Sequence, residues 1–151
     1  MIQYKTFESW DLMRYLRDEL KINIEDLSED IDYLTMNSLS EQNGQKNFYF
    51  TAFDGNKIVG VLKLKTEGSD SLRNPGYYNW LSFCSVSKEY RGLGISENLI
   101  KNMFDFMTKK GIKDLLASGY TESGLKYLEP KLEKYSKKNN INFKDEKEVS
   151  F

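Results

Sequence analysis

Residues 77–110 read YYNWLSFCSVSKEYRGLGISENLIKNMFDFMTKK, and this stretch decides the fold. Residues 77–86 are rich in aromatic and β-branched side chains, which predicts a strand with both faces partly buried. A helical pattern of apolar residues then runs from Leu99 to Met107. A basic glycine turn at 91–96 separates the two patterns. The stretch therefore predicts a strand, a tight turn and an amphipathic helix.

The glycine turn is suited to bind phosphate. The first turn of a helix has backbone N–H groups without intrahelical partners, and the helix dipole adds partial positive charge there. Gly92 and Gly94 lack the Cβ atoms that would hold a phosphate away from these groups, and Arg91 adds a planar donor fork. The predicted ligand is a phosphate or a pyrophosphate. The simpler alternative is a turn that only reverses the chain, with Arg91 in solvent.

This turn resembles the acyl-coenzyme A site of the GNAT N-acetyltransferase superfamily, which has Arg or Gln, two residues, Gly, one residue, and then Gly or Ala. Arg91, Gly94 and Ser96 stand at these positions, and Ser96 departs from the pattern while remaining small. In that family the preceding strand bonds the pantetheine arm of acetyl-coenzyme A through its backbone. The resemblance therefore implies a cofactor site made by Cys84, Val86, Arg91, Gly92, Leu93, Gly94, Ile95 and Ser96.

Strict alternation of side chains within residues 77–86 would place Trp80 with Cys84 on one face of the predicted strand, and Leu81 with Phe83 on the other.

The first half of the chain contains both strand and helix patterns. The Asp-Gly pair at 54–55 is a strong hairpin signal. The predicted elements are a strand at 2–7, a helix that Glu8 or Ser9 can cap, a second helix from about Ile24, and strands at 46–53 and 57–66.

The second half predicts a short buried strand at 112–117, parallel to strand 77–86 and separating from it at the carboxyl ends. Pro130 predicts a kink, or a second helical segment, in the helix that follows, and residues 140–151 predict a small closing hairpin. The resemblance implies an α+β fold in one domain over residues 1–151. Its sheet would be twisted and mostly antiparallel, with a splayed parallel strand pair and about four flanking helices.

Composition narrows the function classes. A net charge of -1 gives no general attraction to nucleic acid or to an anionic membrane, and we find no apolar run or leader pattern that predicts membrane insertion. The absence of histidine excludes a histidine base, and with one cysteine the usual zinc ligand sets are excluded too. The lone cysteine predicts a reducing, cytoplasmic environment.

Acetyl transfer to an amine needs a polarised thioester carbonyl, a deprotonated amine and a proton for the leaving thiolate. The resemblance implies that a backbone N–H near Cys84 polarises the carbonyl. Many relatives carry a Glu on the strand corresponding to 77–86, but this strand has no acid. The base is left open between a water chain held by Ser82 or Ser85 and a carboxylate from the acidic helix at 25–32. Cys84 itself is interpreted as a small buried residue rather than a nucleophile.

The general acid is predicted from the resemblance as well. GNAT proteins often place a Tyr within a pattern of Asn, two residues, Ala, three residues and Tyr. Aligning Thr121 and Gly124 with this pattern puts Leu128 at the Tyr position, so Tyr127 is the predicted acid and Tyr120 the alternative. A half-buried packing role for Tyr127 explains the sequence equally well.

Three hypotheses follow. The first is an N-acetyltransferase that moves an acetyl group from acetyl-coenzyme A to a small-molecule or peptide amine, by direct transfer in a ternary complex. The second is a non-catalytic coenzyme A sensor or interaction module on the same fold. The third, a nucleotide-binding protein, is disfavoured because the turn lacks the Lys-Ser/Thr ending of a P-loop. A homodimer is compatible with the sequence.

Overall fold

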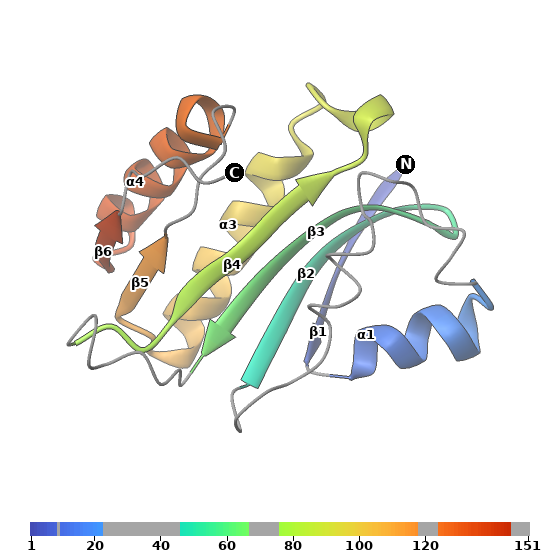
Figure 1. Cartoon of the computed structure of the whole chain (residues 1–151), viewed down its shortest axis with the longest axis horizontal. Coiled ribbons are helices and arrows are strands. Elements are labelled where there is room, and N and C mark those ends of the chain that lie inside the picture. The colour runs from blue at the N-terminus through green and yellow to red at the C-terminus, as the bar shows by residue number, and fades with distance from the viewer. Residues whose placement is uncertain (9, 23–45, 67–75, 118–123, 146–151) are drawn as a thin grey trace.

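The computed structural model describes residues 1–8, 10–22, 46–66, 76–117 and 124–145. Six strands form one sheet in the order β1-β2-β3-β4-β5-β6 (Figure 1). The strands are β1 (Ile2–Glu8), β2 (Lys46–Asp54), β3 (Lys57–Thr66), β4 (Trp80–Val86), β5 (Asp114–Ala117) and β6 (Asn142–Asp145). The helical segments are α1 (Asp11–Arg14) with η1 (Tyr15–Glu19), η4 (Lys88–Tyr90), α3 (Ile95–Lys110), η5 (Gly124–Leu128) and α4 (Glu129–Lys138). The predicted α+β class is confirmed.

The helices differ in detail from the expectation of about four. Within the described ranges the α-helices are α1, α3 and α4, and the predicted second helix from Ile24 lies outside those ranges. Glu8 is not a cap, because it is the last residue of β1, and α1 begins after Trp10 without a side-chain capping bond. Ser9 is outside the described residues. None of the helices described is long and apolar enough to cross a membrane.

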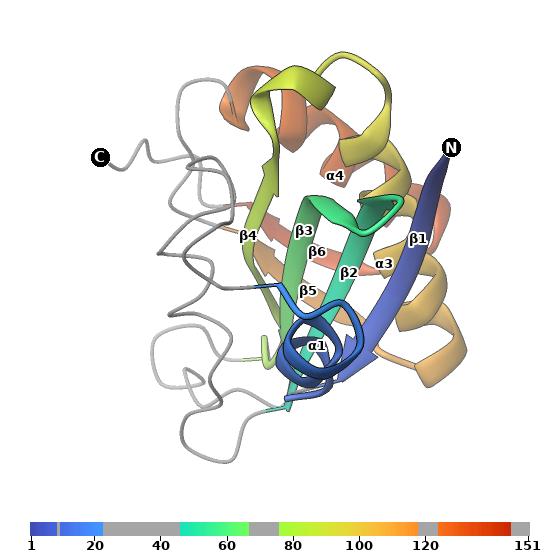
Figure 2. The same cartoon turned by 90° about the vertical axis from the view of Figure 1, so that its right-hand side faces the viewer.

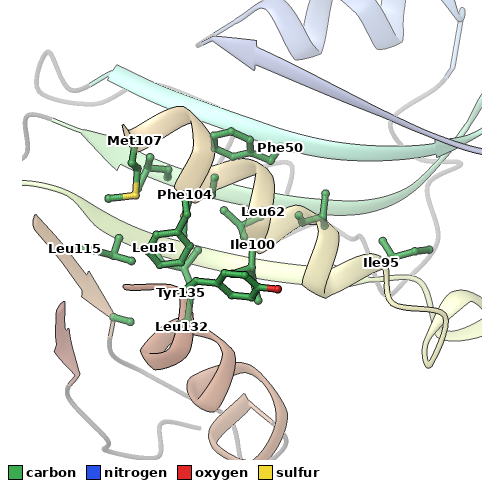
Figure 3. Packing of buried hydrophobic residues seen from close by; sticks show 14 of the residues in the cluster. Phe50, Leu62, Leu81, Ile95, Ile100, Phe104, Met107, Leu115, Leu132 and Tyr135 are labelled. Carbon is green, nitrogen blue, oxygen red and sulfur yellow. The ribbon is translucent and has the colours of Figure 1, made fainter. Parts of the chain in front are cut away.

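The sheet is covered on both faces. α1 packs on one face, and α3 and α4 pack on the other (Figure 2). We call these the α1 face and the α3 face. On the α1 face, Leu12 and Leu16 pack against Tyr49, Phe53 and Val61. The larger core lies on the α3 face and includes Phe50, Leu62, Leu81, Ile100, Phe104, Met107, Leu115, Leu132 and Tyr135 (Figure 3).

A β-bulge changes which side of the sheet the β4 side chains occupy. Lys63 pairs with Phe83, but the next residue, Leu64, pairs with Leu81, so Ser82 is an extra residue on β4. The bulge reverses the alternation at this point. Leu81 therefore joins the core on the α3 face, whereas Phe83 packs against the α1-face cluster. The strict alternation predicted from the sequence is wrong here.

The starts of β4 and β5 are tied together by a carboxylate. Oδ2 of Asp114 accepts hydrogen bonds from the backbone N–H groups of Tyr78 (2.7 Å) and Asn79 (3.0 Å). Its Oδ1 accepts a third from the Asn79 amide nitrogen at 2.9 Å. Because Asp114 takes these N–H groups, β4 begins at Trp80 rather than at the predicted Tyr77. The predicted parallel pairing of the two strands is confirmed, with Trp80 opposite Leu116.

The end of the described chain adds a sixth strand to the sheet. β6 pairs in parallel with β5, with Phe143 opposite Leu115, and the sequence analysis did not predict this pairing. The predicted second arm lies outside the described residues. Pro130 stands in the first turn of α4, where a missing N–H costs nothing, and a separate segment, η5, precedes it. Pro130 therefore marks a new helical segment, which was one of the two predicted outcomes.

Candidate active site

The glycine turn is anchored to the sheet just after β4 ends. Ser87 is fully buried, and its backbone N–H donates to the Val59 carbonyl at 2.8 Å. The Tyr90 N–H returns to the Ser87 carbonyl at 2.9 Å, which closes the short helix η4. These backbone bonds fix the place at which the chain leaves the sheet.

Tyr90 ties the turn to the hairpin between β2 and β3. Its hydroxyl donates a 2.7 Å hydrogen bond to Oδ2 of Asp54, and this bond raises the pKa of Tyr90 above its ordinary value. The ammonium of Lys57 lies 5.4 Å from the centre of the Tyr90 ring. The turn therefore contacts three strands before α3 begins, so its glycines are presented from a rigid support.

Gly92 and Gly94 both adopt the left-handed conformation that favours glycine, with φ of 80° and 81°. A Cβ atom built on either residue would meet nothing within 4 Å. The backbone conformation therefore favours glycine at both positions. Without side chains, and with no described atom in that space, the backbone of the turn is accessible. Residues 91–94 are all exposed, and Leu93 is 66% exposed. No side chain of the described residues occludes the glycines of this turn.

α3 begins directly on this turn. Gly94 is its N-cap, and the first helical bond runs from the Asn98 N–H to the Gly94 carbonyl at 3.1 Å. The N–H groups of Ile95, Ser96 and Glu97 precede that bond, so they have no partner within the helix. The Ile95 side chain is buried in the core, so only its backbone can serve a ligand. Ser96 follows the N-cap position and does not cap the helix.

Arg91 links the turn to the end of β4. Its Nε donates to the Val86 carbonyl at 3.0 Å, while the residue as a whole remains exposed. This bond holds the guanidinium beside the start of α3. The predicted donor fork is therefore placed at the turn, and one of its N–H groups is used to position it.

The parallel strands part next to the turn, as predicted. β5 ends at Ala117, which is opposite Leu81, whereas β4 continues to Val86. The backbone of β4 around Cys84 is thus beyond the last pairing with β5 found in the described residues. Backbone groups on such an edge are available to an extended ligand. The predicted site residues Cys84 and Val86 lie on this segment, immediately before the turn.

Cys84 has the properties of a packing residue. Its side chain lies against the core on the α3 face, and this burial raises the pKa of the Cys84 thiol to about 12. The ammonium of Lys131 opposes the effect only weakly. The thiol is therefore protonated at neutral pH, which does not suit a nucleophile.

The predicted acid, Tyr127, lies on η5 and is 59% exposed, with the Lys126 ammonium 5.1 Å from its ring centre. Leu128, at the position where the family pattern has Tyr, instead packs against the core on the α3 face. Tyr127 is therefore free of the core, while its role in catalysis stays a prediction. Tyr120 and the acidic helix at 25–32 lie outside the described residues.

Gly60 is a positioning residue that the sequence analysis did not single out. A Cβ atom at this position would lie 3.1 Å from Cγ2 of Ile95 and 3.2 Å from Cδ1 of Leu99. The missing side chain lets the first turn of α3 approach β3 closely. A glycine inside an apolar strand is the signal that could have revealed this close contact.

The residues at the turn fit a diphosphate: two exposed left-handed glycines, unpaired helical N–H groups and a positioned guanidinium lie together at the parted strands. Residues 10–124 match the family model of the acetyltransferase (GNAT) family. The chain therefore belongs to the acetyltransferase (GNAT) family.

Among curated proteins, the chain is similar to N-alpha-acetyltransferase 30 of Schizosaccharomyces pombe, with 26% identity over 103 residues. The match covers 68% of this chain but 65% of that protein, so this chain spans about two thirds of its relative's length.

Solved structures show the same fold at low identity. An aminoglycoside acetyltransferase from an uncultured soil metagenomic sample matches with a TM-score of 0.53 and 20% identity, covering 86% of each chain. The catalytic domain of the Tetrahymena GCN5 histone acetyltransferase, in complex with coenzyme A, matches with a TM-score of 0.53 and 13% identity over 87% of this chain and 75% of that one.

Proposed function

We propose that this protein transfers an acetyl group from acetyl-coenzyme A to an amine of a small molecule or peptide. The observation that carries the proposal is the exposed, left-handed glycine turn at the start of α3, beside the parted strands β4 and β5. The structure of the Tetrahymena relative holds coenzyme A, which supports this choice of donor. We assign the diphosphate to the turn and the pantetheine arm to the β4 backbone at Cys84 to Val86.

The chain's own groups then supply most of the chemistry. The N–H groups at the start of α3 neutralise the diphosphate charge, and the Arg91 guanidinium adds charge-assisted bonds. A backbone N–H near Cys84 polarises the thioester carbonyl, as an oxyanion hole does. The amine nitrogen forms its bond to the carbonyl carbon, and the carbon–sulfur bond breaks. Tyr127 is assigned as the group that gives a proton to the leaving thiolate.

Direct transfer in a ternary complex is favoured over an acyl-enzyme. An acyl-enzyme needs a nucleophile, and the thiol of Cys84 packs against the core and is protonated at neutral pH. Initial-rate measurements with both substrates varied should therefore give intersecting rather than parallel reciprocal plots.

The acceptor is an amine whose class the relatives suggest. These relatives are an N-alpha-acetyltransferase, an aminoglycoside acetyltransferase and a histone acetyltransferase. A screen should therefore include a peptide with a free N-terminus, an aminoglycoside, a lysine peptide and a polyamine, with thiol release as the readout.

The second candidate is a non-catalytic coenzyme A sensor. It is favoured by the packing of Leu128 into the core at the position where the family pattern has its Tyr. Tight binding of acetyl-coenzyme A, together with no thiol release for any amine in the screen, would support the sensor and contradict the enzyme.

The turn can be tested with two matched glycines at opposite ends of α3. Gly94 and Gly111 have φ of 81° and 72°, and neither has an atom within 4 Å of a built Cβ. Replacing either glycine by alanine should lower the unfolding free energy by a similar ~1–2 kcal/mol, because the alanine Cβ is disfavoured in the left-handed backbone conformation. Only Gly94→Ala should weaken acetyl-coenzyme A binding in calorimetry, by roughly tenfold, or about 1.4 kcal/mol.

The control is Gly111→Ala, which should bind the cofactor like the unmodified chain. Gly94→Glu adds bulk and negative charge at the assigned diphosphate position, so it should abolish binding. Undiminished binding by Gly94→Glu would overturn the proposed function.

A further inference from the structure

Lys63 is a buried amine in the middle of the sheet. It lies on β3 and is only 2% exposed. It pairs with Tyr49 of β2 on one side and with Phe83 of β4 on the other, so the three side chains share the α1 face. Nζ of Lys63 lies 5.7 Å from the centre of the Tyr49 ring. A lysine so deeply buried is rare unless it is paired or functional.

Among the described residues, no carboxylate forms an ion pair with this amine. Burial disfavours its ammonium form, and the like charge of Lys65 disfavours it further, which together lower the pKa of Lys63 to about 8. A substantial fraction of the amine is therefore neutral near physiological pH.

The surroundings of Lys63 contain few other titratable groups. On the described part of the α1 face, these are Tyr49 on β2, Lys65 on β3, and one strand further out the hydrogen-bonded pair of Lys5 and Tyr15. On β4, Phe83 lies across from Lys63 and Trp80 across from Lys65, and neither carries a charge. Burial on this face thus brings the pKa of Lys63 toward neutral pH.

Lys63 is also close to the assigned site of transfer. Its partner Phe83 directly precedes Cys84, whose N–H is assigned to the thioester carbonyl, and it directly follows the bulged Ser82. The opposite face of β4 is filled by α3 and its core, so an acceptor has to approach from the α1 face. β4 has no acidic residue and the chain has no histidine, so neither usual base is available on this strand.

We propose that Lys63 is the general base that deprotonates the acceptor amine. This inference rests on the proposed function, because it assigns a residue to the same reaction. The neutral Nζ takes one proton from the acceptor ammonium, directly or through one water. The freed lone pair of the acceptor nitrogen then attacks the carbonyl carbon. The nitrogen loses a second proton as the amide forms, and this proton replaces the one that Tyr127 gives to the leaving thiolate. Lys63 returns its own proton to solvent, so one net proton goes to bulk water.

Two substitutions distinguish a Lys63 that acts as a general base from a Lys63 that only supplies positive charge. Lys63→Met keeps the length and removes both functions, whereas Lys63→Arg keeps a positive charge but cannot act as a base at neutral pH. We expect both variants to lower kcat at least 100-fold with the best amine of the screen, as expected for loss of a general base. Both should bind acetyl-coenzyme A in calorimetry within about twofold of the unmodified chain.

The pH profile adds a readout that a structural role would not move. The kcat of the unmodified enzyme should fall below about pH 8, because Lys63 is protonated there. Lys65→Met removes the neighbouring charge, so it should shift the pKa that governs kcat upward. Lys101→Met is the matched control, since it removes an exposed lysine from α3 on the other side of the sheet. It should leave that pKa unchanged.

The outcomes are distinct. Near-normal kcat in Lys63→Arg would show that Lys63 binds an anionic group of the acceptor, and would overturn the base assignment alone. An unshifted pH profile in Lys65→Met would also overturn it. If the unmodified protein acetylates no amine, both this inference and the catalytic part of the proposed function fail. Loss of cofactor binding in Gly94→Glu with the Lys63 results as expected would confirm the two independently.

Discussion

At the scale of single residues, the backbone and the side chain of Cys84 have different roles in the proposed site. Its backbone lies at the assigned thioester site, yet its side chain packs in the core on the α3 face. Its proposed role therefore needs only the backbone N–H, which every residue except proline carries. A catalytic thiol would need an environment that lowers its pKa, and burial here does the reverse.

This assignment predicts that Cys84→Ala retains kcat within about twofold, because the N–H is preserved. With the thiol pKa near 12, only about one thiol in ten thousand is ionised at pH 8, so iodoacetamide should modify the folded protein very slowly. Mass spectrometry after timed alkylation, with the urea-unfolded chain as the control, measures this directly. Rapid modification of the folded chain, or an inactive Cys84→Ala, would contradict the account.

The residues of the turn could be predicted from the sequence, but their supports could not. Glycines and an arginine between a strand and a helix carry a local signal, and Gly92 and Gly94 have the backbone that this signal predicts. Tyr90 and Lys63 depend on residues far away in the chain, Asp54 and Tyr49, so no local pattern reveals their roles. Their environments exist only once the strands are paired.

At the scale of elements, the contact between β3 and α3 positions the ligand-binding end of the helix. Gly60 allows the first turn of α3 to lie against the strand, where Ile95 and Leu99 cover the glycine. A side chain at position 60 has to push the Ile95 and Leu99 side chains away, because the built Cβ distances are already shorter than ordinary contacts. Packing at this point therefore controls where the N–H groups of the turn are directed.

We predict that Gly60→Val destabilises the protein by about 1–3 kcal/mol through overpacking, even though valine favours strands. It should also weaken acetyl-coenzyme A binding, because the start of α3 moves. Met107→Ala is the control: it removes a buried side chain at the far end of α3 and costs about 2–5 kcal/mol. Urea unfolding and calorimetry on both variants should show weaker binding for Gly60→Val alone, and equal binding losses would contradict the prediction.

The strands themselves were largely predictable, because alternating and aromatic patterns mark them. The bounds of β3 match the predicted range, and β2 is one residue longer. The bulge at Ser82 was not predictable, because it is defined by the register against β3 rather than by the β4 sequence. The pairing of β6 was also missed, since short apolar pieces near a charged turn fit a hairpin equally well.

At the scale of the whole molecule, the two faces of the sheet have different proposed roles, one on the donor side and one on the acceptor side. The α3 face holds the larger core and supports the helix whose N-terminus we propose as the donor site. The α1 face carries Lys63 beside the β4 bulge, where the acceptor is expected to approach. The strands β4 and β5 separate between these two faces. The Asp114 carboxylate ties the strands together at one end, and at the other end β4 extends beyond its last residue paired with β5.

The most direct test of this arrangement is a titration of the isotopically labelled protein with acetyl-coenzyme A, followed by amide NMR. The account predicts that the largest shifts fall on the amides of residues 91–97 and 84–86, with little change on the exposed side of α4. Binding with its main shifts elsewhere, or no shifts at saturating acetyl-coenzyme A, would contradict the assignment of the glycine turn as the diphosphate site.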